Sequence, residues 1–291
     1  MLSPAEIRTL FIFLAGFLPA FILSLPAISL GRRWGWLSTP RPDRHAERAV
    51  PLSGGGVLCL ALTLPVLLFD DGWRPLPLAW AFTLLGIGDD LREMNPALKA
   101  ALTGLLALAA PWVLGTAGAG FYPLQVLVLW LLLHAHNLID NMDGVALGTG
   151  FLTFIGLALL SDEPVLWGAV GATAGLLVWN LPPARIFLGD GGSFLLGYWG
   201  WVWIVQAAAG LTPVTVRILP LLILFALPLL DMSFVTLTRI LRGSRPWIGG
   251  RDHLTHRLGR LTGSSRIALW IWLTMQAGLI VMALFLADAW F

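Results

Sequence analysis

Apolar runs of membrane-spanning length recur along the whole sequence, and they restrict the fold more than any other feature. A helix needs about 20 mostly apolar residues to cross the hydrocarbon core of a bilayer. Only 12% of the 291 residues are charged and 57% are hydrophobic, which excludes a water-soluble domain of ordinary composition. The predicted spans are about 7–30, 54–69, 75–88, 98–116, 123–137, 145–161, 164–180, 192–208, 214–240 and 267–287. We therefore expect an all-α integral membrane protein with about ten transmembrane helices and one polytopic domain, residues 1–291.

Basic residues fall mainly in every second loop. Of the 18 Lys and Arg residues, 15 follow odd-numbered spans, and Arg41, Arg44 and Arg48 belong to the first of these loops. Because loops rich in Lys and Arg stay in the cytoplasm, we expect these loops inside and both termini outside. The formal net charge of +2 is too small to indicate a nucleic-acid partner. A single cysteine, Cys59, excludes an internal disulfide.

Polar side chains cluster in four of the predicted cytoplasmic loops. The first cluster is Asp89 and Asp90, followed by Lys99. A divalent cation or a basic substrate group would relieve the repulsion between adjacent carboxylates, and a solvated helix end is the alternative. The second cluster, NLIDNMDG at 137–144, holds carboxylates and amides without a basic residue, which suits a hard cation or a polar ligand. Asp143 is also a candidate helix cap.

The third cluster, NLPPARIFLGDGGS at 180–193, places Asp190 among glycines where a span begins. Backbone N–H groups at such a turn favour anions, so Asp190 is a candidate helix cap, a metal ligand beside a phosphate, or both. Phe187 is a candidate platform for a base, or it simply packs in the membrane. The fourth cluster, RPWIGGRDHLTHRL at 245–258, combines Arg forks that suit phosphate with two His residues. A basic loop for anionic lipid explains the Arg residues but not the His pair.

One further acid, Asp231, lies inside the ninth predicted span. An ionisable side chain at that depth usually faces the bundle interior and serves a function, but the sequence does not indicate which. Together the four clusters place carboxylates, basic side chains and a Gly-rich turn on one face. This combination favours metal-assisted phosphoryl transfer at the bilayer surface, between one lipid substrate and one soluble substrate.

The segments LLGIGDD, NLIDNMDG, PARIFLGDGGS and GRDHLTHRL resemble, in order, those of the polyprenyl-phosphate N-acetylhexosamine-1-phosphate transferases. The resemblance covers residues from about 40 to 258 and is closer to the WecA-like branch than to the MraY-like branch. It implies a bacterial inner-membrane enzyme that faces the cytoplasm and transfers a sugar phosphate from a UDP-N-acetylhexosamine to undecaprenyl phosphate, releasing UMP. This reaction starts lipid-linked cell-surface glycans such as O-antigen. The sequence leaves the aminosugar, the pathway and a homodimer open.

The resemblance also assigns roles to individual residues. It implies Asp190 and Asn137 as ligands of Mg²⁺, or of Mn²⁺ in its place, and Asp143, Asn180 and Phe187 as uridine contacts. The residues expected to take part in catalysis are Asp89, Asp90, Asp140 and His253. Those expected to contact the diphosphate and the sugar are Lys99, Arg251, His253 and His256. We favour direct attack by the lipid phosphate on the β-phosphorus, and a covalent carboxylate intermediate is the alternative.

Two positions depart from the family's pattern. Thr255 stands where the last motif often has a histidine, which bears on sugar choice. Leu52 stands where an early Arg is usual, so that a phosphate contact is missing or comes from Arg44 or Arg48. Two other classes compete with this interpretation. An ion-coupled transporter would use Asp231 and the loop acids, but its site is expected near the midplane. A CDP-alcohol phosphotransferase would need further acids after Asp143.

Overall fold

The computed structural model describes residues 3–38, 49–70, 72–118, 121–161, 163–209, 214–247 and 249–289. Arg41, Arg44 and Arg48 of the first basic loop lie outside these ranges. The helices are α1 (Pro4–Arg33), α2 (Gly54–Phe69), α3 (Leu76–Leu91), α4 (Pro96–Leu114), α5 (Tyr122–Ile139), α6 (Val145–Leu160), α7 (Leu166–Asn180), α8 (Gly189–Ala209), α9 (Val214–Ile223), α10 (Ala226–Leu241), α11 (Leu254–Thr262) and α12 (Ser265–Ala289). Among the described residues there is no β-strand beyond an isolated bridge between Leu37 and Pro51. The predicted all-α class is confirmed.

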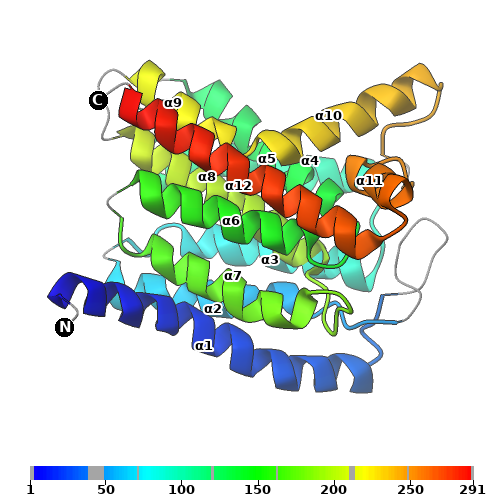
Figure 1. Cartoon of the computed structure of the whole chain (residues 1–291), viewed down its shortest axis with the longest axis horizontal. Coiled ribbons are helices and arrows are strands. Elements are labelled where there is room, and N and C mark those ends of the chain that lie inside the picture. Colours follow the sequence, from blue (N-terminus) through cyan, green and yellow to red (C-terminus); the bar gives the residue numbers. More distant parts are fainter. Residues whose placement is uncertain are drawn as a thin grey trace.

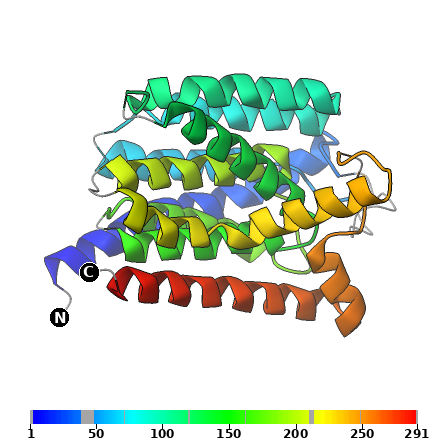
Figure 2. The same cartoon turned by 90° about the horizontal axis from the view of Figure 1, so that it is seen from above.

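Most of the helices run side by side along one direction (Figure 1; Figure 2). The two chain ends lie at the same end of this bundle (Figure 1). The segments that follow α3 and α10 lie at the opposite end, where α11 is also found (Figure 1). Helices α1, α4, α5 and α12 are long and apolar enough to cross a membrane, and α2, α6 and α7 are apolar but shorter. This is the architecture of a helical membrane protein.

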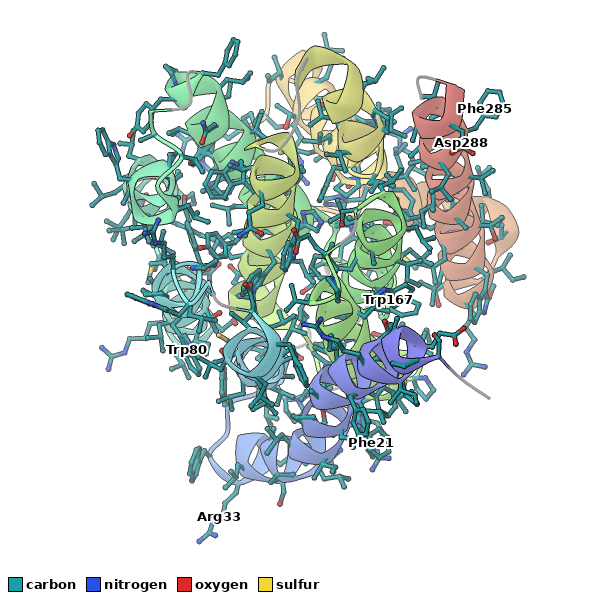
Figure 3. All side chains as sticks on the ribbon, turned by 90° about the vertical axis from the view of Figure 1, so that its left-hand side faces the viewer. Phe21, Arg33, Trp80, Trp167, Phe285 and Asp288 are labelled. Carbon is teal, nitrogen blue, oxygen red and sulfur yellow. The ribbon has the colours of Figure 1, made fainter. Side chains whose placement is uncertain are left out.

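Helix α8 forms the centre of the bundle. It packs against α2, α3, α5, α6 and α9, and it lies near the middle of the end-on view in Figure 3. Its Tyr198, Trp199 and Trp201 are fully buried, as expected for a helix that is apolar on all sides. By contrast, Val281 and Phe285 of the peripheral α12 are strongly exposed. Large apolar side chains on the outer surface are what lipid contact requires, because the surrounding solvent is itself apolar.

The ninth predicted span is not one helix. The prediction of a continuous helix over 214–240 was wrong, because α9 ends at Ile223 and α10 begins at Ala226. The carbonyl of Leu224 would normally accept the N–H of residue 228, which is a proline and has no N–H. Instead it accepts from the side chains of Gln276, at 2.7 Å, and Thr153, at 3.3 Å. These contacts satisfy the carbonyl where the chain turns.

Glycine allows α3 to approach the start of α8 closely. A Cβ atom added to Gly86 would lie 2.2 Å from the backbone nitrogen of Gly191, closer than atoms can pack. A Cβ added to Gly55 of α2 would meet the nitrogen of Gly192 at 2.4 Å. The ends of α2 and α3 therefore touch the backbone of α8 directly, and this contact positions the acid cluster described below.

We expect Gly86→Ala to separate α3 from α8 and to lower the free energy of unfolding by about 1–3 kcal/mol, the usual cost of overpacking. Thermal unfolding of the purified protein in detergent measures this change. Gly278→Ala is the matched control, since an added Cβ there meets nothing within 4 Å. Equal melting temperatures for the two variants would show that the close contact is not required.

Candidate active site

Four of the sequence-predicted polar residues meet at one end of the bundle, although they come from four helices. Asp89 lies near the end of α3, Lys99 in the first turns of α4, Asn137 near the end of α5 and Asp190 at the start of α8. The local sequence fixes the position of Lys99, because Asn95 caps α4 by accepting the N–H of Ala97 at 2.8 Å. The helix ends that the sequence predicts on one face are thus brought together.

Lys99 lies between two carboxylates. Its Nζ is 2.8 Å from Oδ2 of Asp89 and also contacts Oδ2 of Asp190. The other oxygen of Asp89 accepts the backbone N–H of Met94 at 2.6 Å. The alternative of a solvated acid pair at a helix end is therefore wrong for Asp89, whose two oxygens are both bonded. This group of Asp89, Lys99 and Asp190 is called the acid–lysine cluster below.

Asp90 faces a different partner from its neighbour Asp89. Its carboxylate accepts the backbone N–H of Asp190, with distances of 3.1 and 3.0 Å to the two oxygens. Asp90 therefore caps α8 from another helix. Gly189 makes room for it with a φ of +69°, and a Cβ there would lie 2.4 Å from Oδ2 of Asp90. The expectation that the Gly-rich turn leaves its N–H groups for an anion needs correction at Asp190, whose N–H is already bonded.

Asn137 lies beside Asp190. Its Nδ2 donates to the hydroxyl of Ser193 at 3.1 Å, and that hydroxyl donates to the carbonyl of Asp190 at 3.1 Å. Carboxylate and amide oxygens are the ligands that Mg²⁺ prefers, so the residue types fit a hard cation. Within the described ranges no group of three His, Cys, Asp or Glu side chains is arranged as a ready metal site. Here the Lys99 ammonium is the cation between Asp89 and Asp190.

Asp143 and Asn180 join the second polar cluster to the third. Asp143 accepts the N–H of Ala184 at 2.9 Å, so it does not cap α6 as the sequence allowed; Gly144 precedes that helix instead. Asn180 is buried, accepts the N–H of Gly144 at 3.2 Å and donates to the carbonyl of Ile186 at 2.8 Å. Both side chains thus fix the loop that carries the half-buried Phe187, whose N–H donates to Pro51 at 2.8 Å.

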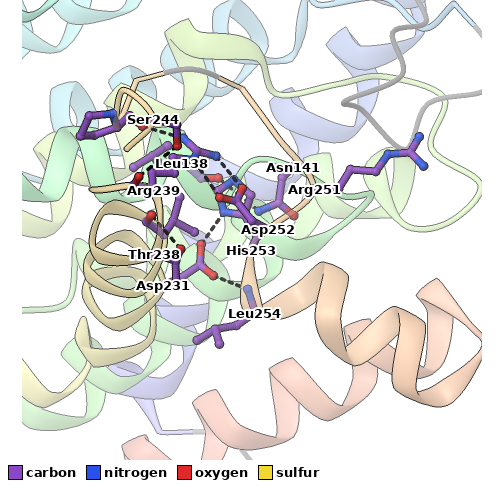
Figure 4. A network of polar contacts seen from close by, with 12 residues as sticks. Leu138, Asn141, Asp231, Thr238, Arg239, Ser244, Arg251, Asp252, His253 and Leu254 are labelled. Atoms are coloured by element: carbon purple, nitrogen blue, oxygen red, sulfur yellow. Dashed lines mark hydrogen bonds and ion pairs between the residues drawn. The ribbon is translucent and has the colours of Figure 1, made fainter. Parts of the chain in front are cut away.

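The fourth cluster is held by α10 (Figure 4). Arg239 forms a two-pronged ion pair with Asp252, at 2.9 and 2.7 Å. Burial acts to raise the pKa of Asp252, but the Arg239 guanidinium outweighs it and holds the pKa below its usual range. Further along the loop, His253 Nδ1 lies 2.7 Å from Oδ2 of Asp231. The imidazole is almost fully buried, and His256 packs edge-on against it with ring centroids 5.7 Å apart.

The last two residues predicted for the site are Asp140 and Arg251. Asp140 follows α5 directly and lies near enough to Asp90 for the two charges to repel. Arg251 is exposed, and its carbonyl accepts a hydrogen bond from Arg260 at 2.9 Å. Sequence reasoning missed the contact in which Thr255 donates to Asn141 at 2.8 Å. That bond links the fourth cluster to the second, and no spacing in the sequence indicates it.

The chain is similar to known proteins over the region that contains the acid–lysine cluster. A family model described as glycosyl transferase family 4 matches residues 75–208. The chain is 28% identical to the undecaprenyl-phosphate alpha-N-acetylglucosaminyl 1-phosphate transferase of Thermotoga maritima, over 61% of this chain and 59% of that protein. It is 26% identical to a probable undecaprenyl-phosphate N-acetylglucosaminyl 1-phosphate transferase of Bacillus subtilis, over 92% of this chain and 82% of that protein.

A relative from the other branch is also similar. The phospho-N-acetylmuramoyl-pentapeptide-transferase of Shouchella clausii is 30% identical over 66% of this chain and 73% of that protein. The region matched by the family model contains Asp89, Lys99, Asn137 and Asp190, which meet at one end of the bundle. With these matches over most of its length, the chain belongs to glycosyl transferase family 4.

Proposed function

We propose that this protein transfers an N-acetylhexosamine 1-phosphate, from GlcNAc or a related aminosugar, from its UDP-sugar to undecaprenyl phosphate and releases UMP. Its membership of the family and the names of its relatives support this reaction. The observation that carries the proposal is the acid–lysine cluster, in which Lys99 joins carboxylates from α3 and α8 at one end of an apolar bundle. Such a cluster combines a phosphate-binding cation with carboxylates at a lipid surface. Neither a transporter nor a CDP-alcohol phosphotransferase is needed to explain it.

We also propose an orientation in the membrane, which the distribution of basic residues between the loops supports. We place the site and the Arg-rich loops in the cytoplasm of a bacterium and both chain ends on the other side of the inner membrane. Helices α1 to α8, α9 together with α10, and α12 would make ten crossings. The UDP-sugar then reaches the site from the cytoplasm, where nucleotide sugars are made.

A groove on the outer surface of the bundle suits the acceptor lipid. It lies between α4 and α5, has a volume of about 520 Å³ and is lined almost entirely by apolar side chains. Ala101, two residues beyond Lys99, and Trp130 are part of its lining. In our proposal a polyprenyl chain lies in this groove and its phosphate extends around the start of α4 to the ammonium of Lys99. Because the surrounding membrane is itself apolar, the groove would align the polyprenyl chain, and the charge of Lys99 would supply the affinity for its phosphate.

The donor diphosphate requires a cation in addition to Lys99. Asp89, Asp90, Asp140 and Asp190 lie around this end, and their charge would repel a diphosphate. In our proposal Asp190 and Asn137 would hold Mg²⁺ or Mn²⁺, and the ion would supply positive charge to the diphosphate and to the departing UMP. Asn137 already lies next to Asp190, through Ser193.

We assign the remaining predicted residues to the two ends of the donor. Asp143 lies in the turn before α6, Asn180 ends α7, and hydrogen bonds join both to the segment around Phe187, so we assign these three residues to the uridine end. Their hydrogen bonds to the backbone indicate that Asp143 and Asn180 shape this subsite. Arg251 and His256 belong to the sugar and diphosphate end, together with His253.

The reaction we favour is a single displacement. An oxygen of the lipid phosphate forms a bond to the β-phosphorus, the bond from that phosphorus to the bridging oxygen breaks, and UMP carries away the electron pair. A phosphate monoester is mostly ionised near neutral pH, so it needs little activation by a base. Asp89 therefore positions Lys99 and the acceptor rather than removing a proton. Retention of configuration at a chiral β-phosphorus would contradict this mechanism and favour a covalent intermediate.

The experiment that tests the function is a donor panel. Purified protein with undecaprenyl phosphate and Mg²⁺ is given UDP-GlcNAc, UDP-GalNAc or a UDP-linked deoxy-aminosugar, and the release of UMP is measured. We expect release from at least one donor and none without the lipid. If no donor releases UMP with either Mg²⁺ or Mn²⁺, the proposed reaction is wrong.

We expect Asp190→Ala to lower turnover about 1,000-fold, because the charge stabilisation from a bound metal is worth several kcal/mol. Binding of Mn²⁺, followed by electron paramagnetic resonance, should weaken in parallel. Asp288→Asn is the control, since this acid lies near the C-terminal end of α12, away from the site (Figure 3). Unchanged Mn²⁺ binding in Asp190→Ala would remove Asp190 from the ligand set.

We expect Lys99→Met to lower kcat/KM for the lipid phosphate about 10- to 100-fold, since a hydrogen bond to a charged group contributes about 1.5–3 kcal/mol. Lys99→Arg should recover part of the loss because it keeps the charge. Initial rates at varied lipid concentration measure both variants. An unchanged kcat/KM in Lys99→Met would show that the ammonium only balances Asp89 and Asp190.

A further inference from the structure

Helix α10 carries a buried acid whose two oxygens are both engaged. Asp231 is fully buried; its Oδ2 lies 2.7 Å from Nδ1 of His253, and its Oδ1 accepts the backbone N–H of Leu254 at 2.7 Å. A carboxylate inside an apolar bundle is costly unless it is paired and hydrogen-bonded. These two bonds, drawn in Figure 4, account for its presence at this depth.

The loop that carries His253 is held at a second point on the same helix. Two turns beyond Asp231, Arg239 donates two hydrogen bonds to the carboxylate of Asp252. It also donates to the carbonyl of Pro246 at 2.6 Å. Residues 252, 253 and 254 are therefore each bonded to a charged side chain of α10. The short helix α11 begins directly after this point, so its start is fixed relative to α10.

The contact with Asp231 determines which nitrogen of the imidazole carries the proton in its neutral form. A carboxylate accepts hydrogen bonds only, so Nδ1 must be the donor and Nε2 keeps its lone pair. No hydrogen bond from the described residues reaches Nε2. The edge-on ring of His256 restricts rotation of the imidazole. Nε2 is thus the nitrogen that is left for a ligand.

The loop also connects to the rest of the site. Thr255, which follows within the first turn of α11, donates to Asn141 in the turn between α5 and α6 at 2.8 Å. That turn also contains Asp140 and Asp143. The imidazole therefore stands at the edge of the region assigned to the donor.

We propose that Asp231 is a positioning residue that keeps the proton on Nδ1 of His253 and so presents Nε2 to the phosphosugar of the donor. The contact with the donor rests on the proposed function, whereas the pairing of Asp231 with His253 does not. In many sites an acid behind a histidine fixes its tautomer and orientation in this way. Asp231 itself touches no substrate and acts only through the imidazole.

Asp231→Asn separates this role from simple packing. The amide keeps the size of the side chain and an oxygen for the N–H of Leu254, but it offers an N–H to Nδ1. The proton of His253 should then move to Nε2. Nitrogen NMR of the histidine-labelled protein, at a pH where the imidazole is neutral, should show Nδ1–H in the parent protein and Nε2–H in Asp231→Asn. Nε2–H in the parent protein would overturn the proposal.

A double-mutant cycle provides the second readout. We expect Asp231→Asn to lower kcat/KM about 10- to 100-fold, as is common for residues behind a first contact. In a His253→Gln background the same change should cost less than about 2-fold, because its target is gone. If the two changes are fully additive in free energy, so that their fold-losses in kcat/KM multiply, Asp231 has only a structural role and the proposal is overturned. Ser233→Ala on α10 is the control, since its exposed hydroxyl donates only to the carbonyl of Leu229.

The two readouts distinguish the failure of each idea. The tautomer measurement needs no substrate, so it decides the pairing even if the protein never releases UMP. If UMP is released, the tautomer is as expected and the cycle is nonetheless fully additive, the donor contact of Nε2 is excluded while the transferase reaction stands.

Discussion

The carboxylate of Asp90 extends from α3 to the backbone N–H of Asp190 in the first turn of α8, and the geometry of the site depends on this bond. The start of a helix leaves N–H groups without helical partners, and an apolar interior offers no water to satisfy them. Here the acceptor comes from another helix, so capping α8 and docking α3 are one event. Glycines at the contact leave the space it requires. As a consequence Asp89 and Asp190, far apart in sequence, both face Lys99.

The charges of the acid–lysine cluster also indicate that it serves ligand binding rather than stability. Removing a lysine and two carboxylates from water costs free energy, and well-packed apolar side chains would often be at least as stable. The further acids nearby, Asp90 and Asp140, add repulsion rather than relieve it. A cluster of this kind is therefore poor evidence for stability and good evidence for a ligand that supplies positive charge. The proposed metal would supply that positive charge and would also attract the anionic donor.

Much of this arrangement can be predicted from the sequence, and the rest fails for identifiable reasons. The first eight spans match α1 to α8 within a few residues, because long apolar runs leave few alternatives. The different roles of Asp89 and Asp90 could not be predicted. Neighbours on a helix point about 100° apart, and only the position of α8 determines which of the two acids reaches the N–H of Asp190. The partner of Asp231 was equally hidden, because an irregular loop separates it from His253. The break before α10 could have been predicted, since Pro228 has no N–H to donate to the carbonyl of Leu224.

Thr255 holds the fourth polar cluster against the turn between α5 and α6. After Leu224 the chain changes direction, and α10 extends to the end of the bundle where α11 lies (Figure 1). Thr255 is fully buried there, and its hydroxyl is committed to Asn141. A histidine at this position would have to displace the turn between α5 and α6, because it is larger and its ring nitrogens lie further from the backbone. The departure from the family's pattern therefore fixes the position of the loop directly. The predicted influence of Thr255 on sugar choice would then be indirect, through the position of His253 and His256.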